Sequence, residues 1–131
     1  MFKITAIQDK TRQKEICELC GVEFREDSFA YLLYDIEDGH TMGMSQFEIL
    51  GERGYIFDLR SAPGVSDFEA MFILGRQTMN FIDLCGSHIC QASSDAGDKS
   101  LLSAIGFKEH DGAYIANMEG MFSGHCSGEC K

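Results

Sequence analysis

The sequence contains no tryptophan, a single proline and few positive charges. Only 11 lysine and arginine residues stand against 21 aspartate and glutamate residues, which leaves a formal net charge of −10. Phosphate backbones and anionic membranes repel such a chain, so we expect it to bind neither nucleic acid nor a membrane. It also lacks an apolar run approaching the roughly 20 residues that cross a bilayer, and residues 1–10 lack the apolar core of a signal peptide. We therefore expect a cytoplasmic protein.

The composition is that of a folded globular domain. Hydrophobic residues make up 44% of the 131 residues, which is too many for an intrinsically disordered chain. A chain of this length is expected to bury one core as a single domain. We place that domain at residues 1–122, followed by a Cys- and Gly-rich tail at residues 123–131.

The first half of the chain predicts a strand, a helix and then three consecutive strands. Residues 2–7 alternate between apolar and polar side chains, as in a half-buried strand. Residues 9–20 show helical spacing and end at a glycine, and the apolar positions of this helix are Ile16, Leu19 and Cys20. Tight-turn signals then separate three extended segments, at residues 29–36, 42–50 and 55–60. These segments are expected to form an antiparallel meander.

The second half begins with the longest predicted helix. Pro63 ends the third meander strand, and either Ser66 or Asp67 can cap a helix that extends to Leu84. One apolar stripe follows this helix and consists of Phe68, Met71, Phe72, Gly75, Met79 and Ile82. A short strand, a short helix and a last extended region with a turn follow, at residues 88–92, 99–105 and 107–118. The predicted order is β-α-β-β-β-α-β-α-β.

This order, together with a short apolar helix that ends in Gly106-Phe107 before the last strand, resembles the GCN5-related N-acetyltransferase (GNAT) superfamily over about residues 2–119. The resemblance implies an α/β (α+β) domain with a central, mainly antiparallel mixed sheet flanked by helices. It also implies acetyl-CoA or CoA as cofactor and a small-molecule or peptide amine as acceptor. The leading hypothesis is therefore an acyl-CoA-dependent N-acetyltransferase.

The resemblance also implies where CoA binds. In this fold the third meander strand diverges from the next strand, and the pantetheine arm would contact backbone groups of Leu59, Arg60 and Ser61. The pyrophosphate would lie on amides at the start of the long helix, because a helix N-terminus presents free N–H groups and a positive dipole end. In this sequence those amides belong to Val65, Ser66, Asp67, Phe68, Glu69 and Ala70.

The turn into the long helix departs from the family pattern. Its glycine positions fall on Asp67, Glu69 and Met71, and its Arg or Gln position falls on Ser66. Each carboxylate would oppose a diphosphate by something on the order of 1 kcal/mol at an effective dielectric near 20. A shifted alignment would bring Gly75-Arg76 toward the turn, but it would move the helical stripe out of register. Gly75 is more simply interpreted as a close-packing position.

The family's catalytic residues do not carry over either. Its frequent Tyr general acid falls on Leu102, and an upstream Asn falls on Asp95. Asp58 and Glu48 are the acidic candidates for a general base near the opening between the strands. The sequence therefore predicts a divergent acyltransferase with a weakened or lost cofactor site. The alternative is a non-catalytic binding or regulatory module on the same scaffold, which could form a homodimer.

Acidic side chains gather between the first helix and the second strand. Glu23, Glu26 and Asp27 are simply interpreted as an exposed loop. Near an acceptor groove, the same residues would favour a cationic amine.

The six cysteines include two pairs with the spacing of metal ligands. Cys17 and Cys20 form a CxxC, and Cys126 and Cys130 form a CxxxC. Tetrahedral zinc takes four such ligands, so a zinc-stabilised domain that uses these four residues is a second alternative. The simpler interpretation is free thiols without metal, with Cys20 in the core. A redox role is disfavoured because Cys17 and Cys20 end a helix, where the dipole should raise the thiol pKa.

Overall fold

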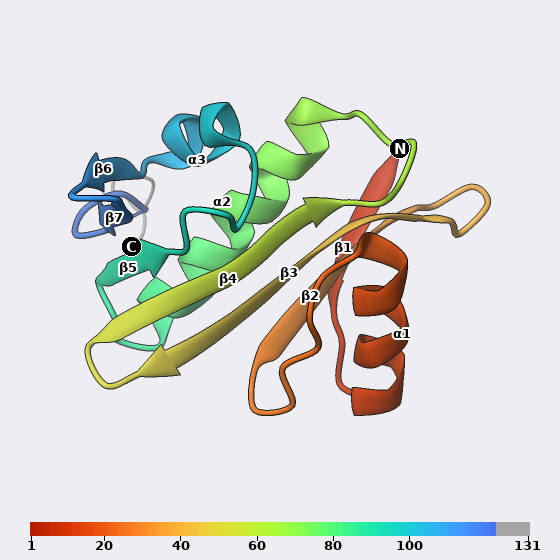
Figure 1. Cartoon of the computed structure of the whole chain (residues 1–131), viewed down its shortest axis with the longest axis horizontal. Helices are drawn as coiled ribbons and strands as arrows, with labels where there is room; N and C mark the ends of the chain where they lie inside the picture. The colour runs from red at the N-terminus through yellow and green to blue at the C-terminus, as the bar shows by residue number, and fades with distance from the viewer. Residues whose placement is uncertain (123–131) are drawn as a thin grey trace.

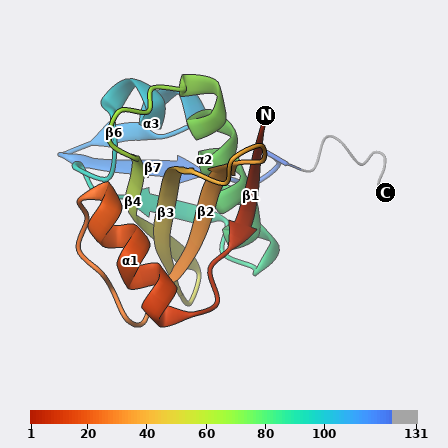
Figure 2. The ribbon, with the colours of Figure 1, turned by 90° about the vertical axis from the view of Figure 1, so that its right-hand side faces the viewer.

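The computed structural model describes residues 1–122 (Figure 1). One sheet of seven strands has the order β1-β2-β3-β4-β5-β7-β6. The strands are β1 (Phe2–Ala6), β2 (Phe29–Asp35), β3 (Thr41–Leu50), β4 (Arg53–Ser61), β5 (Ile89–Ala92), β6 (Lys108–His110) and β7 (Ala113–Asn117). The helices are α1 (Lys10–Cys20), α2 (Phe68–Leu84) and α3 (Lys99–Ile105). Helix α1 covers one face of the sheet and α2 covers the other (Figure 2).

The sheet has the mixed pairing that the sequence predicts. Strands β1 to β4 pair antiparallel in chain order, which confirms the meander. Strand β5 pairs parallel with β4 and antiparallel with β7. The last extended region is a hairpin of β6 and β7 rather than one strand, because it turns back at Asp111, which has a φ of 52°, and Gly112.

Helix α1 confirms the predicted bounds and the burial of Ile16, whereas the prediction is wrong at Leu19. Its N-terminus is capped by Asp9, and Gly21 ends it with a φ of 74°, a conformation that glycine adopts without strain. Leu19 is 46% exposed, and the buried residues are Gln13, Ile16 and Cys17. A glutamine is tolerated there because its side-chain amide is hydrogen-bonded, as described below.

Helix α2 begins at the predicted place and buries a neighbouring stripe. The buried residues are Ala70, Met71, Leu74, Gly75, Thr78, Met79 and Ile82. Phe68 is 53% exposed, so the predicted stripe is wrong at this position, whereas Phe72 is partly buried and packs against the core. Small and polar residues face the sheet as well, and the Thr78 hydroxyl lies 2.9 Å from the Ser45 hydroxyl.

Gly75 fills the close-packing position that the sequence predicts. A Cβ added there would lie 2.8 Å from Cδ1 of Ile105 in α3. The glycine therefore lets α3 approach α2. Within residues 1–122, no helix is long and apolar enough to cross a membrane.

Candidate functional site

Strand β4 diverges from β5 halfway along its length. Four parallel residue pairs join the two strands, and the last joins Ile56 to Ala92. Beyond it the register between β4 and β3 shifts, which leaves Phe57 as an extra, bulged residue. A bulge bends a strand and increases its twist, so it helps carry residues 58–61 away from the line of β5. The divergence expected for a CoA-binding sheet is present.

The loop between β5 and α3 returns to β4 at this point. The Leu59 N–H donates a hydrogen bond of 2.7 Å to the carbonyl oxygen of Ala96. Gly97 lies so close that an added Cβ would be 2.6 Å from the Leu59 carbonyl oxygen. The guanidinium of Arg60 donates to the carbonyl oxygen of Asp95. The backbone N–H of Leu59, expected to contact pantetheine, is thus already paired within the chain.

A small pocket of about 140 Å³ lies where the N-termini of α2 and α3 meet. Five residues of the predicted cofactor site line it, namely Ser61, Val65, Ser66, Asp67 and Phe68. The other four do not line it, namely Leu59, Arg60, Glu69 and Ala70. Small-molecule sites usually have roughly 300–1,000 Å³, so this pocket has room for a fragment of CoA such as one phosphate group.

Both helix N-termini at this pocket carry their own carboxylate cap. The Asp67 carboxylate accepts a hydrogen bond of 3.0 Å from the Ala70 N–H at the start of α2. At α3, the Asp98 carboxylate accepts from the Ser100 N–H at 3.4 Å and from the Ser100 hydroxyl at 3.0 Å. A bound phosphate would have to share these N-termini with two negative charges.

Asp58 lies on the α1 side of β4 within a buried polar network. Its Oδ2 accepts a hydrogen bond of 2.8 Å from Gln46 Nε2. Gln46 Oε1 accepts in turn from Gln13 Nε2 at 2.8 Å and from the Arg25 N–H at 2.9 Å. Burial raises the pKa of the Asp58 carboxyl, while the Gln46 hydrogen bond and the charges of Arg25 and Arg60 lower it by less. A carboxyl with a raised pKa suits a general base near neutral pH.

The sequence identifies Asp58 but misses the two glutamines that hold it. Part of their signal was available, because Gln13 lies with Ile16 and Cys17 at helical spacing, and Gln46 lies in a largely apolar strand, next to Phe47 and two residues from Met44. A polar side chain at such a position is buried only where it is hydrogen-bonded.

The other candidates for acid–base chemistry lie elsewhere. Glu48 is paired across the sheet with Tyr55, on the far side of the bulge from Asp58. Leu102 is fully buried in the core, and Asp95 is exposed. Of the acid–base candidates that the sequence offers, Asp58 is therefore the one best positioned for catalysis, because it follows the last β4–β5 pair on β4.

Only half of the predicted zinc site falls within the described residues, because Cys126 and Cys130 lie outside them. Cys17 rather than Cys20 is the fully buried thiol, and its Sγ lies 3.4 Å from Gln46 Oε1. Burial raises the pKa of both Cys17 and Cys20 to about 11, so both carry their proton at neutral pH. Metals bind the thiolate, and this environment opposes its formation.

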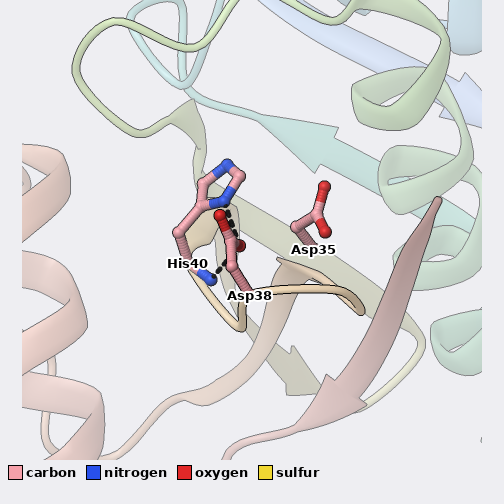
Figure 3. A group of neighbouring side chains, drawn as sticks. All are labelled: Asp35, Asp38 and His40. Carbon is pink, nitrogen blue, oxygen red and sulfur yellow. Dashed lines mark hydrogen bonds and ion pairs between the residues drawn. The ribbon is translucent and has the colours of Figure 1, made fainter.

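One cluster of three possible metal ligands occurs within residues 1–122, in the β2–β3 hairpin (Figure 3). It consists of Asp35, Asp38 and His40. Asp38 Oδ1 lies 2.6 Å from His40 Nδ1 and accepts from the His40 N–H at 3.0 Å, which lowers the Asp38 pKa. Asp35 Oδ1 accepts from the Glu37 N–H at 2.8 Å. These contacts hold the turn together and account for the cluster without a metal.

Comparison with known proteins finds similarity in structure alone. No family model matches the sequence, and no curated protein matches it. A Desulfovibrio desulfuricans protein assigned to the GNAT family of acetyltransferases matches with a TM-score of 0.67 and 11% identity, over 90% of this chain and 99% of that one.

Two further solved structures match over similar lengths. The PaiA N-acetyltransferase of Thermoplasma acidophilum, in complex with coenzyme A, has a TM-score of 0.65 and 12% identity, over 88% of this chain and 96% of that one. The ribosomal-protein-S18-alanine N-acetyltransferase of Escherichia coli has a TM-score of 0.65 and 15% identity, over 88% and 91%. The TM-scores establish a shared fold, and at identities this low the likeness shows the fold alone.

Proposed function

We propose that this chain, which has the GNAT acyltransferase fold, is a divergent acyl-CoA-dependent N-acyltransferase with a weakened cofactor site. The fold supports the reaction class, and the coenzyme A in the PaiA complex supports the cofactor class. The main observation behind a weakened cofactor site is the hydrogen bond from the Leu59 N–H to the Ala96 carbonyl oxygen, because it occupies a donor expected to contact pantetheine. Two carboxylates add to the weakening: Asp67 caps the Ala70 amide, one of those on which a diphosphate would lie, and Asp98 lines the same pocket.

The residues around the divergence have defined roles in this proposal. Bound acetyl-CoA would supply the thioester that an amine attacks. Backbone groups of Leu59, Arg60 and Ser61 orient the cofactor once the loop has moved aside. Asp58 takes the proton of the attacking amine, directly or through water, because its raised pKa suits that task. Leu102 has no proton to donate, so water protonates the departing thiolate.

The acceptor in this proposal is a small-molecule or peptide amine. A net charge of −10 attracts cations and repels polyanions, which favours an amine over nucleic acid. The same charge suits a protein of the cytoplasm that does not bind anionic membranes.

The test is a pair of calorimetric titrations with acetyl-CoA and S-acetyl-pantetheine, which lacks the diphosphate. We expect acetyl-CoA to bind with a Kd in the range of about 0.1–10 mM, less than about 10-fold tighter than S-acetyl-pantetheine. An assay of thiol release with a panel of amines should show slow turnover. A low-micromolar Kd would contradict the weakened site, and absence of binding at about 10 mM would reject the acyltransferase.

The second candidate is a non-catalytic binding or regulatory module on the same scaffold, in the form of a homodimer. The paired Leu59 N–H and the capped helix N-termini support it as well, because both features are also expected of a site that receives no cofactor. It predicts no CoA binding and a dimeric mass in light scattering. A monomer that turns over acetyl-CoA would exclude it.

A further inference from the structure

A second hollow, of about 500 Å³, lies on the face of the sheet that α2 covers. Phe29 and Tyr31 of β2, Phe47 of β3 and Phe81 of α2 line it. Ala6 of β1, which is paired opposite Tyr31, lines it as well and contributes only a methyl group. The volume falls within the range of small-molecule sites, roughly 300–1,000 Å³.

The four aromatic rings line the hollow in two orientations. Phe81 meets Tyr31 at 89° with ring centroids 6.2 Å apart, and it meets Phe29 at 69° and 5.8 Å. Tyr31 and Phe47 are stacked at 23° and 5.6 Å. Phe29 is half exposed, and Tyr31 and Phe81 are partly buried, so these three rings are the ones open to a ligand, whereas Phe47 is buried. The negative face of an aromatic ring attracts a cation.

The charges at the rim have the sign that complements a cation. Glu26 and Asp27 line the hollow and are exposed. Lys10 lies at the rim as well, but its ammonium donates to Gln13 Oε1 at 3.1 Å and to the Ser28 carbonyl oxygen. The lining thus includes two carboxylates and one ammonium, which gives it a net negative charge.

We propose that this hollow binds a small organic cation, of the alkylated or quaternary ammonium class. The aromatic faces contact its alkyl groups and its charge together, and Glu26 and Asp27 supply the counter-charge. An anion would meet the two carboxylates, and a neutral apolar molecule would gain nothing from them. Phe47 and Tyr31 lie on the sheet face opposite Asp58, so this hollow is separate from the proposed general base.

The test compares choline with 3,3-dimethyl-1-butanol, its neutral isostere, by ¹H–¹⁵N NMR titration of the full chain. Choline should shift the amide signals of residues 29–31 and bind about 10-fold more tightly than the isostere. Equal binding of the two compounds overturns the proposal. So does absence of a choline-dependent shift in these signals at about 50 mM, the weakest affinity that the aromatic faces and carboxylates together would allow.

Four variants separate the aromatic contribution from the charge. Phe29→Leu and Phe81→Leu keep an apolar side chain but remove a ring face, so the preference for choline should fall below about 3-fold. Phe29 is half exposed, which protects the fold in that variant. Phe68→Leu, on α2 outside the hollow, is the matched control and should keep the preference. The double variant E26Q/D27N should weaken choline binding and leave the isostere unaffected; the opposite result overturns the proposal.

Discussion

The Leu59 N–H lies 2.7 Å from the carbonyl oxygen of Ala96, and this hydrogen bond joins β4 to the loop at the point where β5 has diverged. A backbone N–H donates one good hydrogen bond, so pantetheine and Ala96 would compete for it. The net worth of such a bond is about 0.5–1.5 kcal/mol. Displacing the loop therefore weakens the binding of a cofactor without forbidding it.

Replacement of Gly97 tests how tightly this loop lies on β4. In Gly97→Ala the new Cβ meets the Leu59 carbonyl oxygen at 2.6 Å, a backbone atom that cannot rotate away. We expect the loop to shift and the free energy of unfolding to fall by about 1–3 kcal/mol. Urea denaturation and faster hydrogen exchange of the Leu59 amide would measure this.

Ser94→Ala is the control in the same loop, because Ser94 is exposed. It should change neither the free energy of unfolding nor the hydrogen-exchange rate of the Leu59 amide. An unchanged exchange rate for the Leu59 amide in Gly97→Ala would show that the contact does not hold the loop.

Neutralising Asp67 should improve anion binding with little loss of stability. Asn caps a helix about as well as Asp, so Asp67→Asn keeps the hydrogen bond to the Ala70 N–H and removes the charge. We expect CoA to bind about 5-fold more tightly, the equivalent of about 1 kcal/mol. Calorimetry measures the affinity, and thermal unfolding measures the stability.

Asp67→Ala serves as the comparison for the cap. It removes the hydrogen bond together with the charge and should cost about 1 kcal/mol of stability. If Asp67→Asn bound CoA no better than the unaltered chain, the charge of Asp67 would not be what weakens the site.

Asp58 should make stability depend on pH in a defined direction. Its carboxyl pKa is raised by burial, so the folded state holds the proton more tightly than the unfolded state. This stabilising contribution is complete below the ordinary pKa of 3.8 and is lost as the pH rises through the raised value. Asp58→Asn has no such proton to lose, so its stability relative to the unaltered chain should increase as the pH rises above the ordinary pKa of 3.8.

The same variant tests the proposed base. Asn cannot accept a proton, so Asp58→Asn should lower kcat by about 10²–10⁴-fold at neutral pH. Urea unfolding across the pH range and the transfer assay check the two effects separately. Parallel stability curves would contradict the raised pKa, and an unchanged kcat would exclude Asp58 as the base.

The cysteines should differ in reactivity according to burial. Cys17 and Cys90 are fully buried, and burial raises their pKa to about 11 and about 12, whereas Cys85 is exposed. In the folded protein, iodoacetamide should modify Cys85 at least about 100-fold faster than Cys17 or Cys90. Peptide mass spectrometry measures the rates, and urea-unfolded protein is the control in which the difference disappears. Rapid labelling of Cys17 in the folded state would contradict its burial.

Features set by neighbouring residues could be predicted well from the sequence. The bounds of α3, the glycine that ends α1 and the turn in the last extended region depend on short-range spacing and on turn chemistry. The order of the elements followed from the same signals. This order was sufficient to predict the GNAT fold, because the order of strands and helices restricts the available topologies.

The stripe on α2 could not be placed correctly in the same way. Helical spacing defines a face but not which of two overlapping stripes meets the sheet, and large aromatic residues suggested the wrong one. The hydroxyl of Thr78 is buried because Ser45 on β3 lies beside it, and a helix sequence carries no information about that neighbour.

By itself, the sequence determined the fold class, the excess of negative charge and the acidic residues at the start of α2, because these depend on composition and local order. The tertiary structure decided that Ala96 pairs with Leu59, that Gln13 and Gln46 form a hydrogen-bonded network with Asp58, and that rings from β2, β3 and α2 line one hollow. Each of these joins residues far apart in the chain. Their contacts exist only once the sheet has formed, and burial then changes their chemistry.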